Sequence, residues 1–374
     1  MSTAVVLLNF GEPEDATMES VVPFLERIFD LNRNLETHAT AVASRERTRA
    51  LAAARAPGLI EEYNAIGGSP LHRQAQAQAE LLETELRARG IDAFAVLGMQ
   101  FTAPFIDSAV HGAMSRGATR FVGLPVYPLC GPTTTVAALE SLRDAVTRLA
   151  PGMDLWEISG WHRHPAYSAM RGSAVRAVAD AAGVSLRDRH SRLVFSAHGT
   201  PIKYLDEGSR YVDYVKDSCA RVAEAAGATA YSIGYQNHSN RPLEWTQPDI
   251  DSVIDQLADD GIRDVVVDAI SFMHEQSETL AELDLELREH AEGRGLRFHR
   301  VPVPFDDPAF IRVLADLVEP FASDGNAVGR DAASGGSVSG GSVSGASVRG
   351  GAAGSLRPCV CRATRCTFCL NGAT

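Results

Sequence analysis

The sequence is short of basic residues and has no long apolar segment. Its 374 residues include 35 lysines and arginines against 47 aspartates and glutamates, which gives a formal net charge of −12. Such a chain repels phosphate backbones, which argues against nucleic acid as a partner. No stretch approaches the roughly 20 consecutive apolar residues of a membrane-spanning helix. Residues 1–15 have no basic segment before their short apolar run, unlike a secretory signal, and we therefore expect a cytoplasmic protein.

Two nucleotide-binding motifs are also absent. No G-x-G-x-x-G follows a predicted strand, and no G-x-x-x-x-G-K-S/T occurs anywhere in the chain. The first 320 residues instead alternate β-rich runs with helical patterns, which is typical of βαβ units around parallel sheets. The predicted strands are 3–8, 93–97, 120–124, 192–195, 230–235, 264–270 and 297–301. The predicted helices are 71–89, 104–116, 133–149, 166–182, 212–226, 249–258, 279–292 and 308–317.

This alternation has similar spacing on each side of Pro151. It predicts an α/β fold with two similar, doubly wound, Rossmann-like halves, residues 1–150 and 151–322. In such sheets a ligand lies beyond the carboxyl ends of the strands. We therefore expect the functional site at strand ends, in a cleft between the halves.

The C-terminal part of the chain differs in composition. Residues 323–356 are rich in glycine and serine and include a five-residue repeat, so we expect a flexible, disordered linker. A cysteine-rich tail, 357–374, follows it. From residue 332 onward there are four arginines and no acidic residue, so this part carries +4 and the rest of the chain −16.

Cysteine is scarce, and four of the six cysteines lie within the tail. Cys361, Cys366 and Cys369 have the C-x4-C-x2-C spacing of plant-type two-iron ferredoxins, and Cys359 could supply a fourth ligand. Cys130, in a proline-rich loop, is a possible substitute. A zinc site and reactive thiols are the alternatives, although four-cysteine zinc sites usually show two C-x2-C pairs. The remaining cysteine, Cys219, is expected in a helix core.

Two predicted strands end in residues suited to chemistry. His198 follows strand 192–195 among small residues, and imidazole can accept a proton or bind a metal near neutral pH. A loop histidine bonded to the backbone is the alternative. Glu278, Glu282 and Glu286 recur every four residues, on one face of the predicted helix 279–292. They form either a solvated face or a ladder that relays protons or passes a cation inward. Aromatic and apolar residues at several strand ends suit a flat apolar ligand.

Six motifs in order, over about residues 3–320, resemble the ferrochelatase family, whose members insert ferrous iron into a porphyrin in haem synthesis. They are residues 8–13 (LNFGEP), 63–71 (YNAIGGSPL), 127–128 (YP), 196–201 (SAHGTP), 235–236 (YQ) with Trp245, and 278–280 (ETL) followed by Glu282, Asp284 and Glu286. Gln276 is a departure, because many members have a histidine two residues before the matching glutamate.

The resemblance implies a chelatase-type fold with the porphyrin in the cleft between two similar α/β halves. His198 matches the family's active-site histidine and Glu278 its partner carboxylate, and we assign both jointly to proton transfer and to binding the Fe²⁺ substrate. Glu282 and Glu286 are candidates for an inner proton or metal ladder. The candidates to pack on the porphyrin ring are Phe10, Tyr63, Tyr127 and Trp245. Family members from several lineages also carry a [2Fe-2S] cluster near the C-terminus, in agreement with the cysteine spacing.

Two rival functions are a chelatase for another tetrapyrrole or metal, of the sirohydrochlorin type, and a non-catalytic haem-binding or iron–sulfur sensor protein on the same fold. The presence of both His198 and Glu278 favours an enzyme, because a carrier needs no proton acceptor on each face. The choice between protoporphyrin IX and coproporphyrin III, and between monomer and homodimer, stays open. A set of apolar residues could form a lip for peripheral membrane contact or pack in the core: Val21, Val22, Phe24, Leu25, Ile28 and Phe29.

Overall fold

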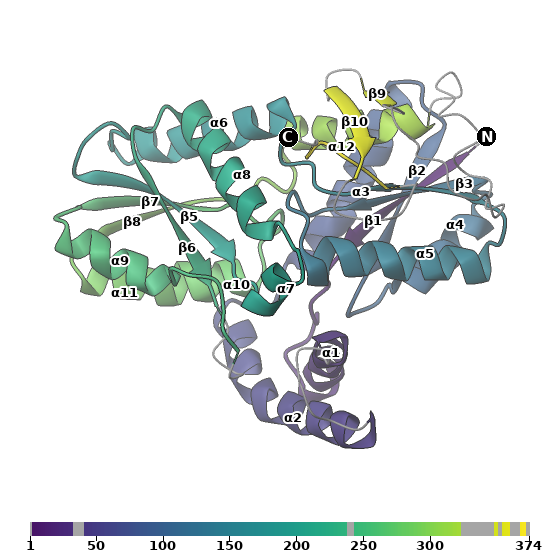
Figure 1. Ribbon diagram of the computed structural model, residues 1–374, viewed down its shortest axis with the longest axis horizontal. Helices are drawn as coiled ribbons and strands as arrows, with labels where there is room; N and C mark the ends of the chain where they lie inside the picture. The colour runs from purple at the N-terminus through teal and green to yellow at the C-terminus, as the bar shows by residue number, and fades with distance from the viewer. Residues whose placement is uncertain are drawn as a thin grey trace. The chain divides into compact units, whose positions relative to one another are not determined.

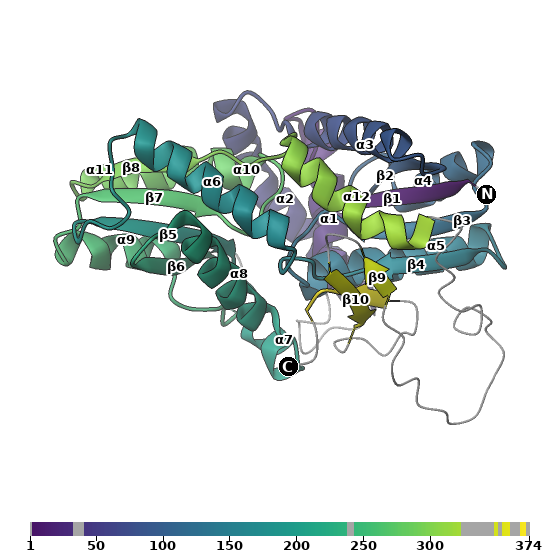
Figure 2. The same ribbon diagram turned by 90° about the horizontal axis from the view of Figure 1, so that it is seen from above.

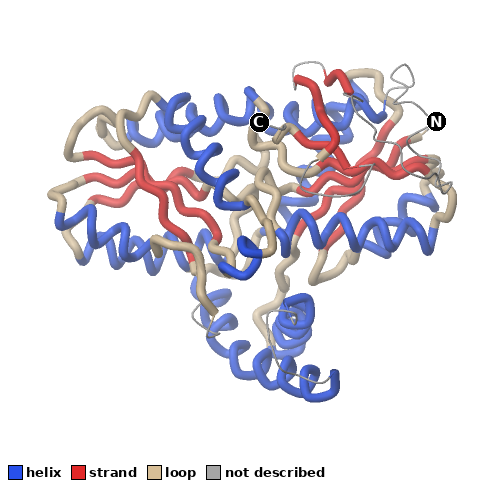
Figure 3. Tube along the Cα trace, viewed as in Figure 1, coloured by secondary structure: helices blue, strands red, loops and turns tan. Residues whose placement is uncertain are grey.

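The computed structural model describes residues 2–32, 41–237, 243–322, 348–350, 354–359 and 367–371. It is an α/β protein with two separate sheets (Figures 1 and 3), as the sequence predicts. The strands are β1 (Thr3–Asn9), β2 (Ala93–Met99), β3 (Arg120–Pro125), β4 (Asp154–Ile158), β5 (Ser191–His198), β6 (Tyr231–Gln236), β7 (Asp264–Ala269), β8 (Arg297–Val301), β9 (Val348–Gly350), β10 (Gly354–Pro358) and β11 (Thr367–Cys369).

Helices connect most of these strands. They are α1 (Met18–Leu31), α2 (Ala41–Ala65), α3 (Leu71–Ala88), α4 (Ile106–Ser115), α5 (Ala137–Leu149), α6 (Pro165–Ala181), α7 (Ile202–Asp206), α8 (Tyr211–Ala226), α9 (Ile250–Asp259), α10 (Ser277–Leu280), α11 (Arg288–Gly293) and α12 (Pro308–Ala322), with π-helical segments η2 (Pro132–Val136) and η3 (Glu282–Leu287). No helix among the described residues is long and apolar enough to cross a membrane.

The chain folds into two compact units. Unit 1 consists of Met1–Asn9, Ala75–Met170 and Asp306–Thr374, and unit 2 of Phe10–Gln74 and Arg171–Phe305. Each unit is therefore discontinuous in sequence, whereas the predicted halves are continuous. The predicted limits 1–150, 151–322, 323–356 and 357–374 stay a prediction of domain organisation.

Unit 1 contains a seven-stranded sheet in the order β2-β1-β3-β4-β11-β10-β9. Its first four strands are parallel, β11 adds parallel to β4, and β10 and β9 follow antiparallel. All seven residues of β1 are buried, because helices cover both faces of a central parallel strand. Helices α5 and α12 lie on opposite faces of this sheet (Figures 1 and 2).

Unit 2 contains a four-stranded parallel sheet in the order β6-β5-β7-β8. Apolar side chains of α9 and α11 pack on one face against β7 and β8, and α8 lies on the other face (Figure 1). The register pairs His198 with Gln236 at the ends of β5 and β6. The carboxyl ends of neighbouring strands therefore bring these two side chains to the same edge of the sheet.

The seven predicted strands are all present, within about three residues at each end, but β4 is missed. Its sequence, DLWEI, has acidic residues at its first and fourth positions and so lacks an apolar strand pattern. Glu157 is nevertheless fully buried, because its carboxylate pairs with the Arg143 guanidinium at 2.6 Å. Strand β9 and the start of β10 fall within the predicted linker, whose residues 323–347 and 351–353 lie outside the described residues.

Candidate active site

His198 is the last residue of β5, and a tight backbone approach fixes its position. Gly199 N donates to Gln236 O at 2.7 Å. A Cβ at Gly199 would overlap Gln236 O and the Asn237 side chain, so only glycine fits there. His198 N donates to Ser271 Oγ at 2.9 Å, which ties the end of β5 to the loop after β7. The small residues around His198 are thus required by close packing of two neighbouring strand ends.

Glu278 faces His198 from α10. The distance between His198 Nε2 and Glu278 Oε1 is 3.1 Å, and Gln276 Nε2 donates to the second carboxylate oxygen of Glu278. The side chains of Gln276 and Thr279 form a capping box at the start of α10. The two residues that the sequence assigns to catalysis therefore lie in direct contact, within one unit. They do not lie on two faces of a ring between them, as the argument against a carrier supposes.

This contact sets the charge of His198. Burial of the imidazole lowers the pKa of His198, but the Glu278 carboxylate, its hydrogen bond and the Gly199 carbonyl together raise the pKa to about 9. The imidazole is therefore protonated at neutral pH. Its Nδ1–H donates to Gly199 O at 2.5 Å and its Nε2–H points to Glu278. The resting site is an imidazolium–carboxylate pair.

Gln236 brings a second carboxylate to the site. Its Nε2 donates to Glu278 O and to Glu282 Oε2, both at 2.8 Å, while its Oε1 accepts from Ser196 Oγ at 2.8 Å. The amide is thus held in one orientation. Sequence reasoning assigns no role to Gln236, although its place at the strand end beside His198 is a signal that could have identified it.

The segment that carries the expected ladder differs from the single helix that the sequence predicts. Helix 279–292 is not one α-helix but α10, η3 and α11, and Glu286 N donates to Ala281 O at 3.0 Å, a π-helical i→i+5 bond. A π-helical turn is about one residue wider than an α-helical turn, so the angles between Glu278, Glu282 and Glu286 differ from those of an α-helix, and their role as a ladder stays a prediction. Glu278 and Glu282 meet at Gln236, whereas Glu286 is exposed. Partial burial and then the Glu62 charge raise the pKa of Glu286.

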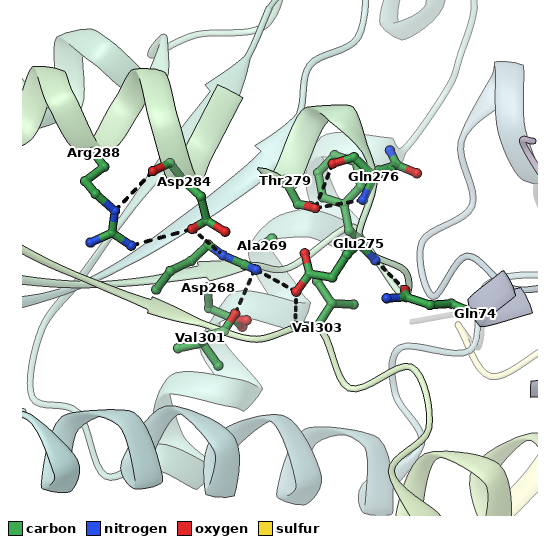
Figure 4. Close-up of polar contacts among 12 residues, drawn as sticks. Gln74, Asp268, Ala269, Glu275, Gln276, Thr279, Asp284, Arg288, Val301 and Val303 are labelled. Carbon is green, nitrogen blue, oxygen red and sulfur yellow. Dashed lines mark hydrogen bonds and ion pairs between the residues drawn. The ribbon is translucent and has the colours of Figure 1, made fainter. Parts of the chain in front are cut away.

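An ion network holds both ends of the segment that carries Glu278 and Glu282 (Figure 4). Arg300, at the end of β8, pairs with Glu275 and with Asp284, each at 2.6 Å. Glu275 Oε1 also accepts from Val303 N at 2.9 Å, and Glu275 N donates to Gln74 Oε1 at 2.8 Å. Because the Arg300 side chain is only 8% exposed, these ion pairs are little screened and restrain the segment strongly.

The four aromatic candidates lie in different surroundings. Phe10 is half-buried in unit 2 and meets Phe24 of α1 edge-on, with ring centroids 6.1 Å apart. Trp245 is also half-buried in unit 2, whereas Tyr63 there is only 1% exposed. Tyr127 belongs to unit 1, where it follows β3. Their contact with a porphyrin stays a prediction.

The described cysteines lie in two places. Cys219 is fully buried in α8, as predicted, and burial raises the pKa of its thiol. Cys130, Cys359 and Cys369 are buried in unit 1. Cys361 and Cys366 lie outside the described residues. Among the residues that the structure does describe, no group of three or more His, Cys, Asp or Glu side chains could hold a metal ion.

The fold belongs to a known class. The sirohydrochlorin chelatase SirB from Bacillus subtilis subspecies spizizenii, solved in complex with cobalt, matches with a TM-score of 0.50 over 86% of this chain and 96% of that chain, at 10% sequence identity. The similarity identifies a chelatase-type α/β fold.

Sequence comparison identifies the family within this class. The Ferrochelatase family model matches residues 2–321. Two proteins named ferrochelatase, from Synechococcus sp. strains RCC307 and JA-3-3Ab, are each 34% identical to this chain. The first match covers 84% of this chain and 81% of the relative, and the second 90% and 98%. A ferrochelatase from Desulfotalea psychrophila is 30% identical, over 84% of this chain and 96% of the relative.

This chain therefore belongs to the ferrochelatase family. Membership of the family confirms the predicted activity: the protein is a lyase that inserts Fe²⁺ into a porphyrin in haem biosynthesis. The sirohydrochlorin and non-catalytic alternatives are not favoured.

Proposed function

We propose that His198 and Glu278 together carry out the proton and metal transfers of porphyrin metallation, on protoporphyrin IX or coproporphyrin III. The observation that carries this proposal is their 3.1 Å contact, held by Gln276 and Gln236 at adjoining strand and helix ends. A histidine and a carboxylate in contact provide both a proton acceptor and ligands suited to Fe²⁺.

The chemistry requires such a pair. Insertion of the metal removes two pyrrole N–H protons while Fe²⁺ loses water ligands. At neutral pH the His198 imidazole is positively charged, with a proton on both ring nitrogens. It must release that proton before it can bind Fe²⁺ or accept a pyrrole proton. An approaching Fe²⁺ favours this release, because it repels the imidazolium and takes its place as the positive partner of the Glu278 carboxylate. Glu282, joined to the pair through the Gln236 amide, offers the next carboxylate along the segment.

The decisive experiment is anaerobic incubation of the purified protein with Fe²⁺ and each porphyrin, followed by absorbance. We expect metallation of at least one porphyrin, and loss of turnover in both His198→Ala and Glu278→Ala with unchanged circular dichroism. His111→Ala and Glu289→Ala, at exposed positions, are matched controls that should keep wild-type rates. Near-normal rates in either active-site variant would contradict the assignment of the pair.

We also propose a [2Fe-2S] cluster in the tail, on Cys359, Cys361, Cys366 and Cys369, with Cys130 as a substitute ligand. Cys359 N donates to Thr367 O at 2.9 Å, and Arg357 pairs with Cys369. Alternate residues of a strand share a face, so Cys359 and Cys369 lie on the same face of the antiparallel pair β10 and β11. This register supports their membership of one ligand set.

A bound [2Fe-2S] cluster contains two iron ions and two inorganic sulfides. Iron and acid-labile sulfide should therefore be present in stoichiometric amounts in protein purified without oxygen. Cys369→Ala should lower both, and Cys219→Ala, at a buried position in α8, should not. A colourless protein that contains zinc and no sulfide would overturn the cluster proposal.

Peripheral membrane contact and a cytoplasmic location stay predictions from the sequence. Val21, Phe24, Leu25 and Phe29 of α1 are buried, which supports the core-packing alternative for these four residues. The exposed large apolar side chains at the ends of α1 are Met18 and Leu31. Flotation with liposomes would test whether α1 also contacts a lipid surface.

A further inference from the structure

Glu12 is a buried carboxyl to which the proposed chemistry assigns no role. It follows β1 in a loop of unit 2 and is only 6% exposed. Its Oε1 accepts from Ser277 Oγ at 2.5 Å, and its Oε2 accepts from Ser69 Oγ at 2.5 Å and from Ser277 N at 3.3 Å. Three donors therefore satisfy the Glu12 carboxyl. They are needed because a carboxyl without hydrogen-bond partners is strongly disfavoured in the protein interior.

These contacts join three segments that are far apart in sequence. Glu12 comes from the 8–13 motif, Ser69 from the 63–71 motif, and Ser277 is the residue before Glu278. Gly67 and Gly68 adopt φ values of 76° and 91°, which suit glycine, and so turn the chain to present Ser69. The motifs that carry the family resemblance thus converge on one carboxyl beside the catalytic pair.

Helix α10 needs such an external restraint. Its four residues form the first turn of a longer helical segment that continues through Ala281 into η3, and the backbone N–H groups of a first turn have no partner within the helix. Its first residue, Ser277, is held by Glu12 through both the backbone N–H and the hydroxyl. The next residue, Glu278, faces His198. A displacement of Ser277 would therefore move the Glu278 carboxylate directly.

We propose that Glu12 is a positioning residue that fixes Ser277 and, through it, the Glu278 carboxylate against His198. The proposal rests on the role of Glu278 proposed above. Burial raises the pKa of Glu12 to about 7, although the bonds from Ser277 and Ser69 lower it. Glutamine at position 12 therefore imitates the neutral, protonated carboxyl, which the wild-type side chain itself reaches near pH 7.

A matched pair of serine variants tests the proposal. Ser277→Ala and Ser69→Ala each delete one hydroxyl that donates to Glu12 at 2.5 Å. We expect Ser277→Ala to lower Tm by about 2–4 °C, because it removes one buried bond. Ser69→Ala should lower Tm at least as much, because Ser69 Oγ also accepts from Leu71 N at 3.2 Å. Ser277→Ala should lower kcat about tenfold with an unchanged KM for the porphyrin, since positioning errors act on the chemical step. Ser69→Ala should keep kcat within about twofold, because it leaves both bonds to Ser277.

A second measurement does not depend on turnover. The pKa of the His198 imidazole, followed by NMR, should fall in Ser277→Ala and in Glu12→Gln but stay near the wild-type value in Ser69→Ala. Equal kcat values for the two serine variants, or an unchanged pKa of His198 in Ser277→Ala, would overturn the proposal. Absence of porphyrin metallation in the wild type would instead contradict the proposed function, and the NMR titration would still decide the role of Glu12.

Discussion

The charge of His198 gives a prediction that can be worked out from the structure. Glu278→Gln keeps the size of the side chain and removes the carboxylate 3.1 Å from Nε2. The pKa of His198 is about 9, against an ordinary value of 6.5, and burial alone would lower it. Taken whole, this rise corresponds to about 3 kcal/mol.

Solvent reduces this magnitude. The imidazole is 35% exposed, so water and salt screen the pair. Glu282 and the Gly199 carbonyl continue to raise the pKa in the variant. We therefore expect the pKa of His198 to fall by about 1 to 2 units, or about 1 to 3 kcal/mol.

The assay is an NMR titration of histidine side chains, in which His198 is assigned by its disappearance in His198→Gln. The sign of the stability change follows from linkage: because the folded-state pKa of His198 is raised, its contribution is present below pH 6.5 and is lost as pH rises towards 9. Urea unfolding of the wild type and Glu278→Gln should therefore differ more at pH 6.5 than at pH 9.5. A pKa of His198 that does not change in the variant would refute the reasoning.

Two further predictions concern the packing behind the site. Asp268→Asn should lower the free energy of unfolding in urea by about 3–5 kcal/mol, because it leaves the buried Arg171 without its ion partner. The control Asp213→Asn, at an exposed position, should change the free energy of unfolding by less than about 1 kcal/mol. Equal effects of the two variants would contradict this prediction. Gly199→Ala should abolish turnover, because the new Cβ would overlap Gln236 O, and a variant with wild-type kcat would show that the strand ends can separate freely.

Much of the fold could be predicted from sequence because parallel strands give local signals. Strands buried on both faces, such as β1 and β7, are continuous apolar runs bounded by polar residues. Strand β4 could not be identified in this way. Its Glu157 is acceptable in the core only because Arg143 and Thr367 contact it, and neither contact is visible in the strand's own five residues.

The site could be predicted in part, for a similar reason. His198 and Glu278 stand at the end of a strand and the start of a helix, where local pattern is informative. The exposed position of Glu286 could not be predicted. A glutamate at every fourth residue is compatible with an α-helix and does not reveal the π-helical segment η3. Glu12 could not be assigned a role, because both of its partners are distant in sequence and only tertiary packing brings them together.

The addition of β11 to the first sheet has a consequence for self-association. Thr367 and Phe368 pair with Glu157 and Ile158, and so cover the side of β4 that would otherwise be an open strand edge. An open edge offers unpaired N–H and C=O groups to another chain, and short terminal strands reduce that hazard. The sheet ends here in β9, which has only three residues. We therefore expect a chain shortened after Ala322 to aggregate more readily than the full chain, because the edge of β4 would be open.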